Sequence, residues 1–226
     1  MARTYAGGTD QIHWYDNSET AVVSIGCVAF WMKTTQVTAN VGVASHWSSS
    51  SRRNWGCVLN NVANKLSLVA YDTSTLRVNL VSTTSVNDGN WWHVCFNYNK
   101  NNGGANTLYI NGTQEATANS SAAWTAGANS YYFTTGDLFD AFWASYVGSL
   151  AEIANWRDVN LGADDITALA SGFSPLRVRP RYLDLYAPMV DSAVNNIEPS
   201  HAAPAGTFSV TGTTVSDHPR IIGGRA

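Results

Sequence analysis

The sequence predicts an all-β protein in which two antiparallel sheets pack face to face as a sandwich. Short runs of alternating apolar and polar residues recur along the chain, separated by residues that favour turns. One such run ends in Asn111-Gly112, the dipeptide that a tight hairpin turn favours. Only 13% of the residues are charged, so Ser, Thr, Asn and Gly must supply the polar surface, and these favour turns and strand faces over helices.

Each expected strand follows from a period-two pattern of apolar side chains. The predicted strands cover residues 21–33, 55–59, 65–71, 76–81, 92–98, 108–110 and 148–156. The first of these is apolar on both faces, as in a central strand. The side chains expected to face the core from the middle of the chain are Leu66, Leu68, Ala70, Leu76, Val78, Leu80, Trp92, Val94, Phe96 and Tyr98. Leu150, Ile153 and Trp156 are the expected core contacts of the last strand.

One short helix and a C-terminal arm complete the predicted architecture. Gly162 can cap the helix, Asp164 and Asp165 suit the helix dipole in the first turn, and Gly172 is placed to end it. Its apolar stripe consists of Ile166, Leu169 and Phe173. We expect residues 1–173 to form the sandwich. Residues 174–226 are richer in Pro and are predicted to form an arm that packs on the sandwich or on a neighbouring subunit.

Composition and charge exclude several classes of protein. The net charge is −3 and no basic run exists, so nucleic-acid binding is not expected. The apolar runs are too short to span a bilayer, and Met1 to Gly8 lacks the apolar core of a signal peptide. Cys27, Cys57 and Cys95 are widely spaced and odd in number, which indicates buried free thiols. Free thiols are typical of a protein that is made in a reducing cytosol.

Five segments in sequence order resemble the laminin-G-like, concanavalin-A-like jelly-roll family. They are Ala29-Phe30-Trp31-Met32-Lys33, the segment 87–94 (NDGNWWHV), Leu108-Tyr109-Ile110-Asn111-Gly112, the segment 148–153 (GSLAEI) and the segment 161–172 around the helix. The resemblance covers roughly Ala21 to Phe173 and implies a two-sheet jelly roll. The tail, with Pro175, Leu183, Tyr186, Pro188 and Asp217-His218-Pro219, resembles tails on such domains in tailed-phage virion proteins.

The sequence argues against catalysis. Some hydrolases of this fold carry Glu-x-Asp-x-x-Glu on one strand, but the corresponding stretch here keeps Glu152 and has Ala154 and Arg157 at the other two places. We therefore expect Glu152 to be structural, held by the backbone or by an arginine. The five histidines are scattered, with no metal-ligand spacing.

No cofactor is expected. Oxygen ligands for calcium are available at Asp72, Asp137 and Asp140, as in some laminin-G-like domains. No compact acidic loop collects several of them, so we interpret these residues as ordinary solvated acids in loops. A decrease in the melting temperature on addition of a chelator would instead support a calcium site.

Aromatic and basic residues in polar, turn-rich segments are the candidate contacts for a ligand or partner. They are Trp47, Arg52, Arg53, Trp55, Trp124, Tyr131 and Trp143. Flat aromatic faces beside Asn and Ser suit sugars, and Trp, Tyr and Arg also dominate protein interfaces. A third reading is that these rings only cover the ends of the sandwich.

The first functional hypothesis is a non-catalytic phage structural protein, a capsid decoration or spike subunit that contacts other virion proteins such as a major capsid protein. Such a protein would be made in the host cytoplasm and reside in the virion, where a homo-oligomer is the expected arrangement on a symmetric particle. The alternative is a carbohydrate-binding module for host-receptor recognition, and a glycoside hydrolase is the third and weakest hypothesis.

Overall fold

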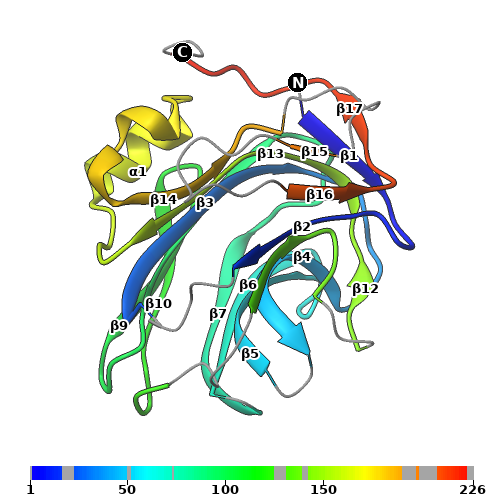
Figure 1. Cartoon of the computed structure of the whole chain (residues 1–226). Coiled ribbons are helices and arrows are strands. Elements are labelled where there is room, and N and C mark those ends of the chain that lie inside the picture. The colour runs from blue at the N-terminus through cyan, green and yellow to red at the C-terminus, as the bar shows by residue number, and fades with distance from the viewer. Residues whose placement is uncertain are drawn as a thin grey trace.

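The computed structural model describes residues 2–16, 23–49, 52–72, 74–124, 131–138, 142–189, 197–198 and 208–222. Their strands form two antiparallel sheets that stack into a jelly-roll sandwich, with one α-helix against the outside of one sheet (Figure 1). The all-β prediction is confirmed. No helix in these ranges is long and apolar enough to cross a membrane.

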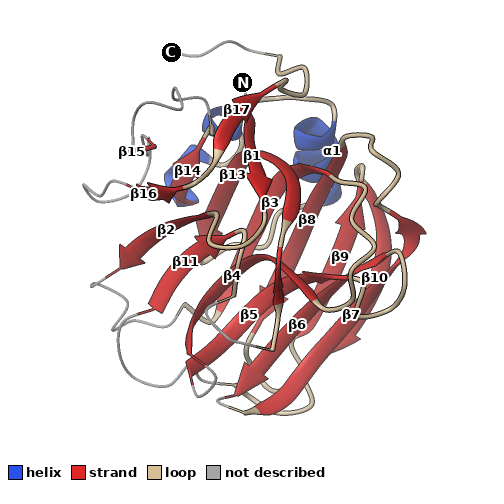
Figure 2. Cartoon of the chain, turned by 90° about the vertical axis from the view of Figure 1, so that its right-hand side faces the viewer, coloured by secondary structure: helices blue, strands red, loops and turns tan. Residues whose placement is uncertain are grey.

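We name the two layers sheet A and sheet B. Sheet A runs in the order β10 (Thr113–Asn119), β9 (Ala105–Ile110), β8 (Trp92–Asn99), β3 (Ile25–Lys33), β13 (Val147–Arg157), β1 (Ala2–Ala6) and β17 (Thr214–Ser216), and β14 (Leu183–Ala187) pairs with β13. Sheet B runs β15 (Ile197–Glu198), β16 (Phe208–Thr211), β2 (Gln11–Asp16), β11 (Tyr131–Thr135), β4 (Val41–Ser49), β5 (Arg52–Leu59), β6 (Lys65–Asp72) and β7 (Thr75–Ser85), and the short β12 (Ala144–Ser145) runs parallel to β4. Figure 2 shows the strands of both layers from the side.

The main core fills the space between the sheets because each strand turns alternate side chains inward. The predicted core residues of β6 and β8 lie there, as do Val78 and Leu80 of β7. Leu76 is exposed, contrary to prediction, because the β6–β7 register shifts between Ala70 and Tyr71 at this end of the hairpin. A second cluster, which includes Trp156, lies on the outer face of sheet A.

Local turn chemistry explains two other predicted features. Asn111 and Gly112 both have positive φ, 48° and 83°, which confirms the tight turn between β9 and β10. The helix α1 spans Ala163–Ala170 after Gly162, and it buries Ile166 and Leu169 against sheet A. Phe173 is 43% exposed, so its predicted place in the apolar stripe is wrong, because the helix has ended before it.

The segment predicted as an arm supplies strands to both sheets. β14 and β17 pair with β13 and β1 in sheet A, and β16 pairs with β2 in sheet B. The blue β1 and the red β17 lie side by side in Figure 1. The N-terminal and C-terminal parts of the chain therefore close the sandwich together.

Candidate functional site

The structure divides the predicted contact residues between two places. Trp47, Arg53 and Trp143 meet on the outer face of sheet B. Trp55 and Trp124 lie elsewhere, buried at one end of the space between the sheets. The side chains of Arg52 and Tyr131 lie outside the described part of the chain.

Strand alternation brings the first group together. In β5 and β6 the core residues alternate with Val58 and Val69, which therefore face outward. Trp47 joins them in one apolar cluster, and its direct cross-strand partner Arg53 shares its face. Leu138 and Trp143, from the segment between β11 and β12, cover this face.

We call Trp47, Arg53, Tyr71, Phe142 and Trp143 the aromatic–arginine cluster. The Arg53 guanidinium carbon lies 5.2 Å from the ring centre of Trp47 and 5.1 Å from that of Tyr71, within cation–π range. The Trp47 ring meets Tyr71 and Trp143 edge to face, with centroids 5.5 Å and 6.5 Å apart. Phe142 stands edge-on to Trp143 at 4.9 Å and is 63% exposed. Phe142 is therefore the ring that this cluster presents to solvent.

Several buried polar atoms on this face have no hydrogen-bond partner among the described residues. They include the indole nitrogens of Trp47 and Trp143 and the hydroxyls of Ser45 and Thr134. Ser45 pairs directly with Thr134 across β4 and β11, which places both hydroxyls on the same face. Buried polar groups are normally satisfied by protein, water or a ligand, so this face retains unused donors and acceptors.

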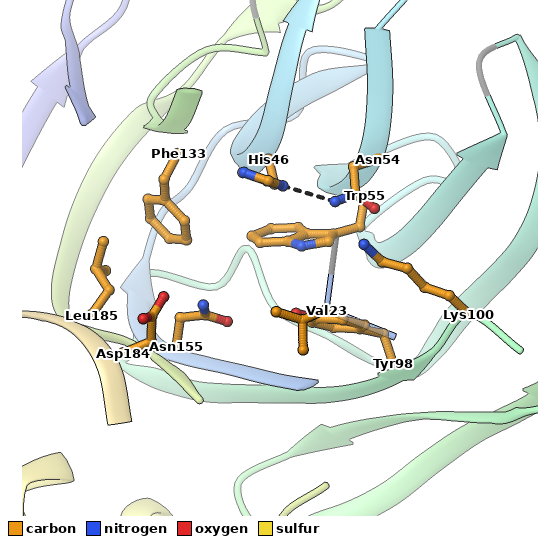
Figure 3. A pocket seen from close by; sticks show the side chains of 10 residues that line it. All are labelled: Val23, His46, Asn54, Trp55, Tyr98, Lys100, Phe133, Asn155, Asp184 and Leu185. Carbon is orange, nitrogen blue, oxygen red and sulfur yellow. Dashed lines mark hydrogen bonds between the residues drawn. The ribbon is translucent and has the colours of Figure 1, made fainter. Parts of the chain in front are cut away.

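A small pocket lies between the sheets, lined by both polar side chains and aromatic rings (Figure 3). We call it the end pocket. Its lining comes from both sheets and consists of Val23, His46, Asn54, Trp55, Tyr98, Lys100, Phe133, Asn155, Asp184 and Leu185. Its interior is about 10 Å³, which is close to the space that one water molecule needs.

The polar groups of the end pocket are held by specific contacts. Asn54 Nδ2 lies 2.8 Å from Nδ1 of His46, and both side chains are buried. The Lys100 ammonium lies 5.5 Å from the ring centre of Tyr98 and 5.2 Å from that of Trp124. On the other side of the pocket, Arg157 Nη1 lies 3.3 Å from Oδ1 of Asp184.

Trp55 and Trp124 are packing residues in this conformation. Trp55 meets Phe96 and Phe133 edge to face, with centroids 4.9 Å and 5.7 Å apart. The Trp124 indole nitrogen donates a hydrogen bond to Ser120 Oγ at 3.0 Å. Neither ring offers an open face to a sugar, although Trp55 lines the end pocket.

The two calcium candidates that lie in the described part of the chain each contact another group. Asp72 pairs with Arg77 at 2.9 Å, and Asp137 Oδ1 accepts from the backbone N–H of Leu138. Asp140 lies outside the described residues. Within the described ranges no three His, Cys, Asp or Glu side chains gather as a metal site would require.

Glu152 is buried, and its partners differ from those predicted. It lies at a bulge of β13, between Ala151 and Ala154, with a φ of 51°. The Tyr186 hydroxyl donates to Oε2 at 2.5 Å, and His218 Nε2 lies 2.9 Å from Oε1. The predicted partner was the backbone or an arginine, and a tyrosine and a histidine from the C-terminal segment take that place. Strand alternation alone gives no signal for a contact so distant in sequence.

The two stacked antiparallel sheets define a jelly-roll sandwich. The chain belongs to the concanavalin A-like lectin/glucanases superfamily, since the Laminin_G_3 family model matches residues 6–167. No curated protein matches the chain.

Solved structures with low sequence identity share this fold. A candidate carbohydrate-binding protein from Bacteroides ovatus has a TM-score of 0.70 at 12% identity, covering 95% of this chain. This chain spans only 59% of that protein's length. A heptameric SAP-like pentraxin from Limulus polyphemus has a TM-score of 0.60 at 13% identity, covering 93% and 94% of the two chains. Domain 4 of the arabinanase AbnA from Geobacillus stearothermophilus, solved with arabinotriose, has a TM-score of 0.53 at 20% identity, covering 67% and 68%.

Proposed function

We propose that this chain is a carbohydrate-binding domain and that the aromatic–arginine cluster is its sugar-contact surface. The family is named for lectins and glucanases, and two of the similar structures are described as binding carbohydrate or hold an oligosaccharide. Similarity at this level of identity supports the class of ligand only by analogy. The geometry of the cluster carries the proposal.

The carrying observation is a guanidinium positioned over two rings, in a cluster that also exposes the ring of Phe142. Arg53 sits over Trp47 and Tyr71, and the exposed Phe142 packs edge-on against Trp143, which contacts Trp47. Sugars present apolar C–H faces that stack on aromatic rings and hydroxyls that need oriented hydrogen-bond partners. Phe142 supplies the ring, and the planar guanidinium of Arg53 supplies donors in a fixed direction. Trp47, because it is buried, supports Arg53 from below.

A glycan array probed with the full chain tests the proposal, followed by calorimetric titration of the best ligand. We expect Phe142→Ala and Arg53→Ala each to weaken binding about tenfold or more, which corresponds to roughly 1.4 kcal/mol. Phe173→Ala is the matched control, because this exposed ring follows α1, the helix that packs against sheet A, and is not part of the aromatic–arginine cluster on sheet B. An array without ligands, or wild-type affinity in both cluster variants, would refute the proposal.

The virion role and virion location inferred from the tail stay predictions, as does the absence of catalysis. Quantitative mass spectrometry of purified virus particles tests the first two predictions. Stoichiometric amounts of the protein relative to the major capsid protein would support a place on the particle. Release of reducing sugar from β-glucans tests the third.

A further inference from the structure

Two amide oxygens that line the end pocket have no hydrogen-bond partner in the part of the chain that the structure describes. Asn54 Oδ1 and Asn155 Oδ1 are both buried and unpaired among the described residues. Asn54 is 2% exposed, and its other amide atom already contacts His46. Both side chains line the pocket, Asn54 from β5 of sheet B and Asn155 from β13 of sheet A. Figure 3 shows the Trp55 ring lying between them.

Leaving a buried acceptor without a hydrogen bond is unfavourable, so two such acceptors in one pocket indicate a missing donor. The alternative orientation of the Asn54 amide would leave its nitrogen without a partner instead, since His46 Nδ1 can bond only one of the two atoms. A hydroxyl both donates and accepts, so it satisfies Asn54 in either orientation. An ammonium group would satisfy only one of them.

The lining favours a neutral group, because it holds one ammonium, that of Lys100, and one carboxylate, that of Asp184, whose charges are opposite. A cation would face the Lys100 ammonium, which already sits over the Tyr98 ring at the same pocket. An anion would face the Asp184 carboxylate and the amide oxygen of Asn155. The interior of about 10 Å³ admits one hydroxyl-sized group, so the rest of any ligand must remain outside.

We propose that the end pocket is a second sugar subsite, which receives a single hydroxyl group of a neutral saccharide at one of its two unpaired amide oxygens, Asn155 Oδ1 or Asn54 Oδ1. The subsite lies between the sheets, whereas the aromatic–arginine cluster lies on the outer face of sheet B, so the two act on different ligand groups. The proposal rests on the proposed carbohydrate-binding function for its class of ligand, and on the pocket alone for its place.

The test is a titration of the full nitrogen-15-labelled chain, followed by proton–nitrogen correlation NMR, with four neutral methyl glycosides: methyl α-glucoside, methyl α-galactoside, methyl α-mannoside and methyl α-arabinofuranoside. The side-chain amides of Asn54 and Asn155 and the indole N–H of Trp55 report on the pocket. The indoles of Trp47 and Trp143 report on the cluster. We expect saturable shifts of the pocket signals with at least one glycoside.

Variants of the pocket distinguish a sugar hydroxyl from a bound water. Asn155→Ala should weaken the pocket affinity about tenfold, because one hydrogen bond to the hydroxyl is lost. Asn79→Ala, at an exposed position of β7, is the matched control and should bind as wild type. Asn155 is only partly buried, so this variant should fold, and Asn54→Ala is the second variant.

Each outcome decides between the two sites. Shifts of the pocket signals that are lost in Asn155→Ala and kept in Asn79→Ala support the subsite. Shifts confined to the Trp47 and Trp143 indoles would show that the aromatic–arginine cluster binds sugar and that the end pocket does not. That result would overturn the subsite and keep the proposed function. Pocket shifts that persist in both asparagine variants would also overturn it. No shift at either site with any glycoside would overturn both proposals.

Discussion

His93 should make the folded protein acid-sensitive, because its imidazole is buried in a place where it cannot carry a charge. The side chain lies on the outer face of sheet A, 1% exposed, with the Trp31 ring edge-on at 5.2 Å. Its Nδ1 has no hydrogen-bond partner among the described residues. Burial lowers the pKa of His93 from 6.5 to about 3.

The sign of the effect follows from the lowered pKa. Between pH 3 and pH 6.5 the unfolded chain binds a proton at this histidine and the folded chain does not. Above pH 6.5 the histidine is neutral in both states and does not change the free energy of unfolding with pH. As the pH falls from 6.5 toward 3, protonation of the unfolded chain lowers the free energy of unfolding progressively. At pH 4.5 the loss amounts to roughly 2–3 kcal/mol, a large share of the stability of a typical domain.

The assay is urea unfolding followed by tryptophan fluorescence at several pH values between 4.5 and 7.5, for the wild type and His93→Phe. The phenylalanine keeps a ring in the site and cannot titrate. We expect the variant to lose about 2–3 kcal/mol less than the wild type between pH 7.5 and pH 4.5. His13→Gln is the control, since the pKa of His13 is also lowered by burial but its ring is only half-buried, and its difference should be smaller. Parallel pH profiles for the wild type and His93→Phe would refute the reasoning.

Two further predictions concern the edge of the sandwich and the thiols. Glu115 of β10 accepts hydrogen bonds from the backbone N–H groups of Thr83 and Thr84 at 2.8 Å and 3.0 Å, which ties β10 to β7 of the other sheet. We expect Glu115→Ala to lower the free energy of unfolding by about 1–3 kcal/mol, measured by urea titration, and an unchanged midpoint would contradict this. Burial raises the pKa of the Cys27 and Cys57 thiols, so iodoacetamide at pH 8 should label neither until urea unfolds the chain, as mass spectrometry would show.

The sequence predicts the sandwich because strand alternation is a local property. Val94 and Phe96 face the core for the same reason that Leu66 and Leu68 do: the side-chain period of a strand is two. The prediction fails where the local pattern is interrupted. Leu76 lies beside a register shift, and Phe173 follows the end of its helix.

The site is less predictable because its members meet through long-range packing. Trp47 sits in a serine-rich segment that suggests an exposed contact, yet Leu138 and Trp143 from a distant segment cover it completely. Conversely, nothing near Phe142 in the sequence marks it as the exposed ring of the cluster. The end pocket joins Asn54 and Asn155 from different sheets, so neither residue signals the other.

The two faces of β5 allow binding and folding to be separated. Arg53 faces outward with Trp47, whereas Trp55 packs inward against Phe96 and Phe133. Replacing Trp55 by alanine would leave a core cavity at a cost of about 3–5 kcal/mol and would also alter the end pocket that Trp55 lines, so a loss of sugar binding in this variant would not separate binding from folding. Arg53 and Phe142 carry no such core packing, so alanine at these positions removes the proposed ligand contacts at little cost to the fold. A chain that stays folded and loses sugar affinity at these two residues would therefore locate binding on the outer face of sheet B, independently of the core.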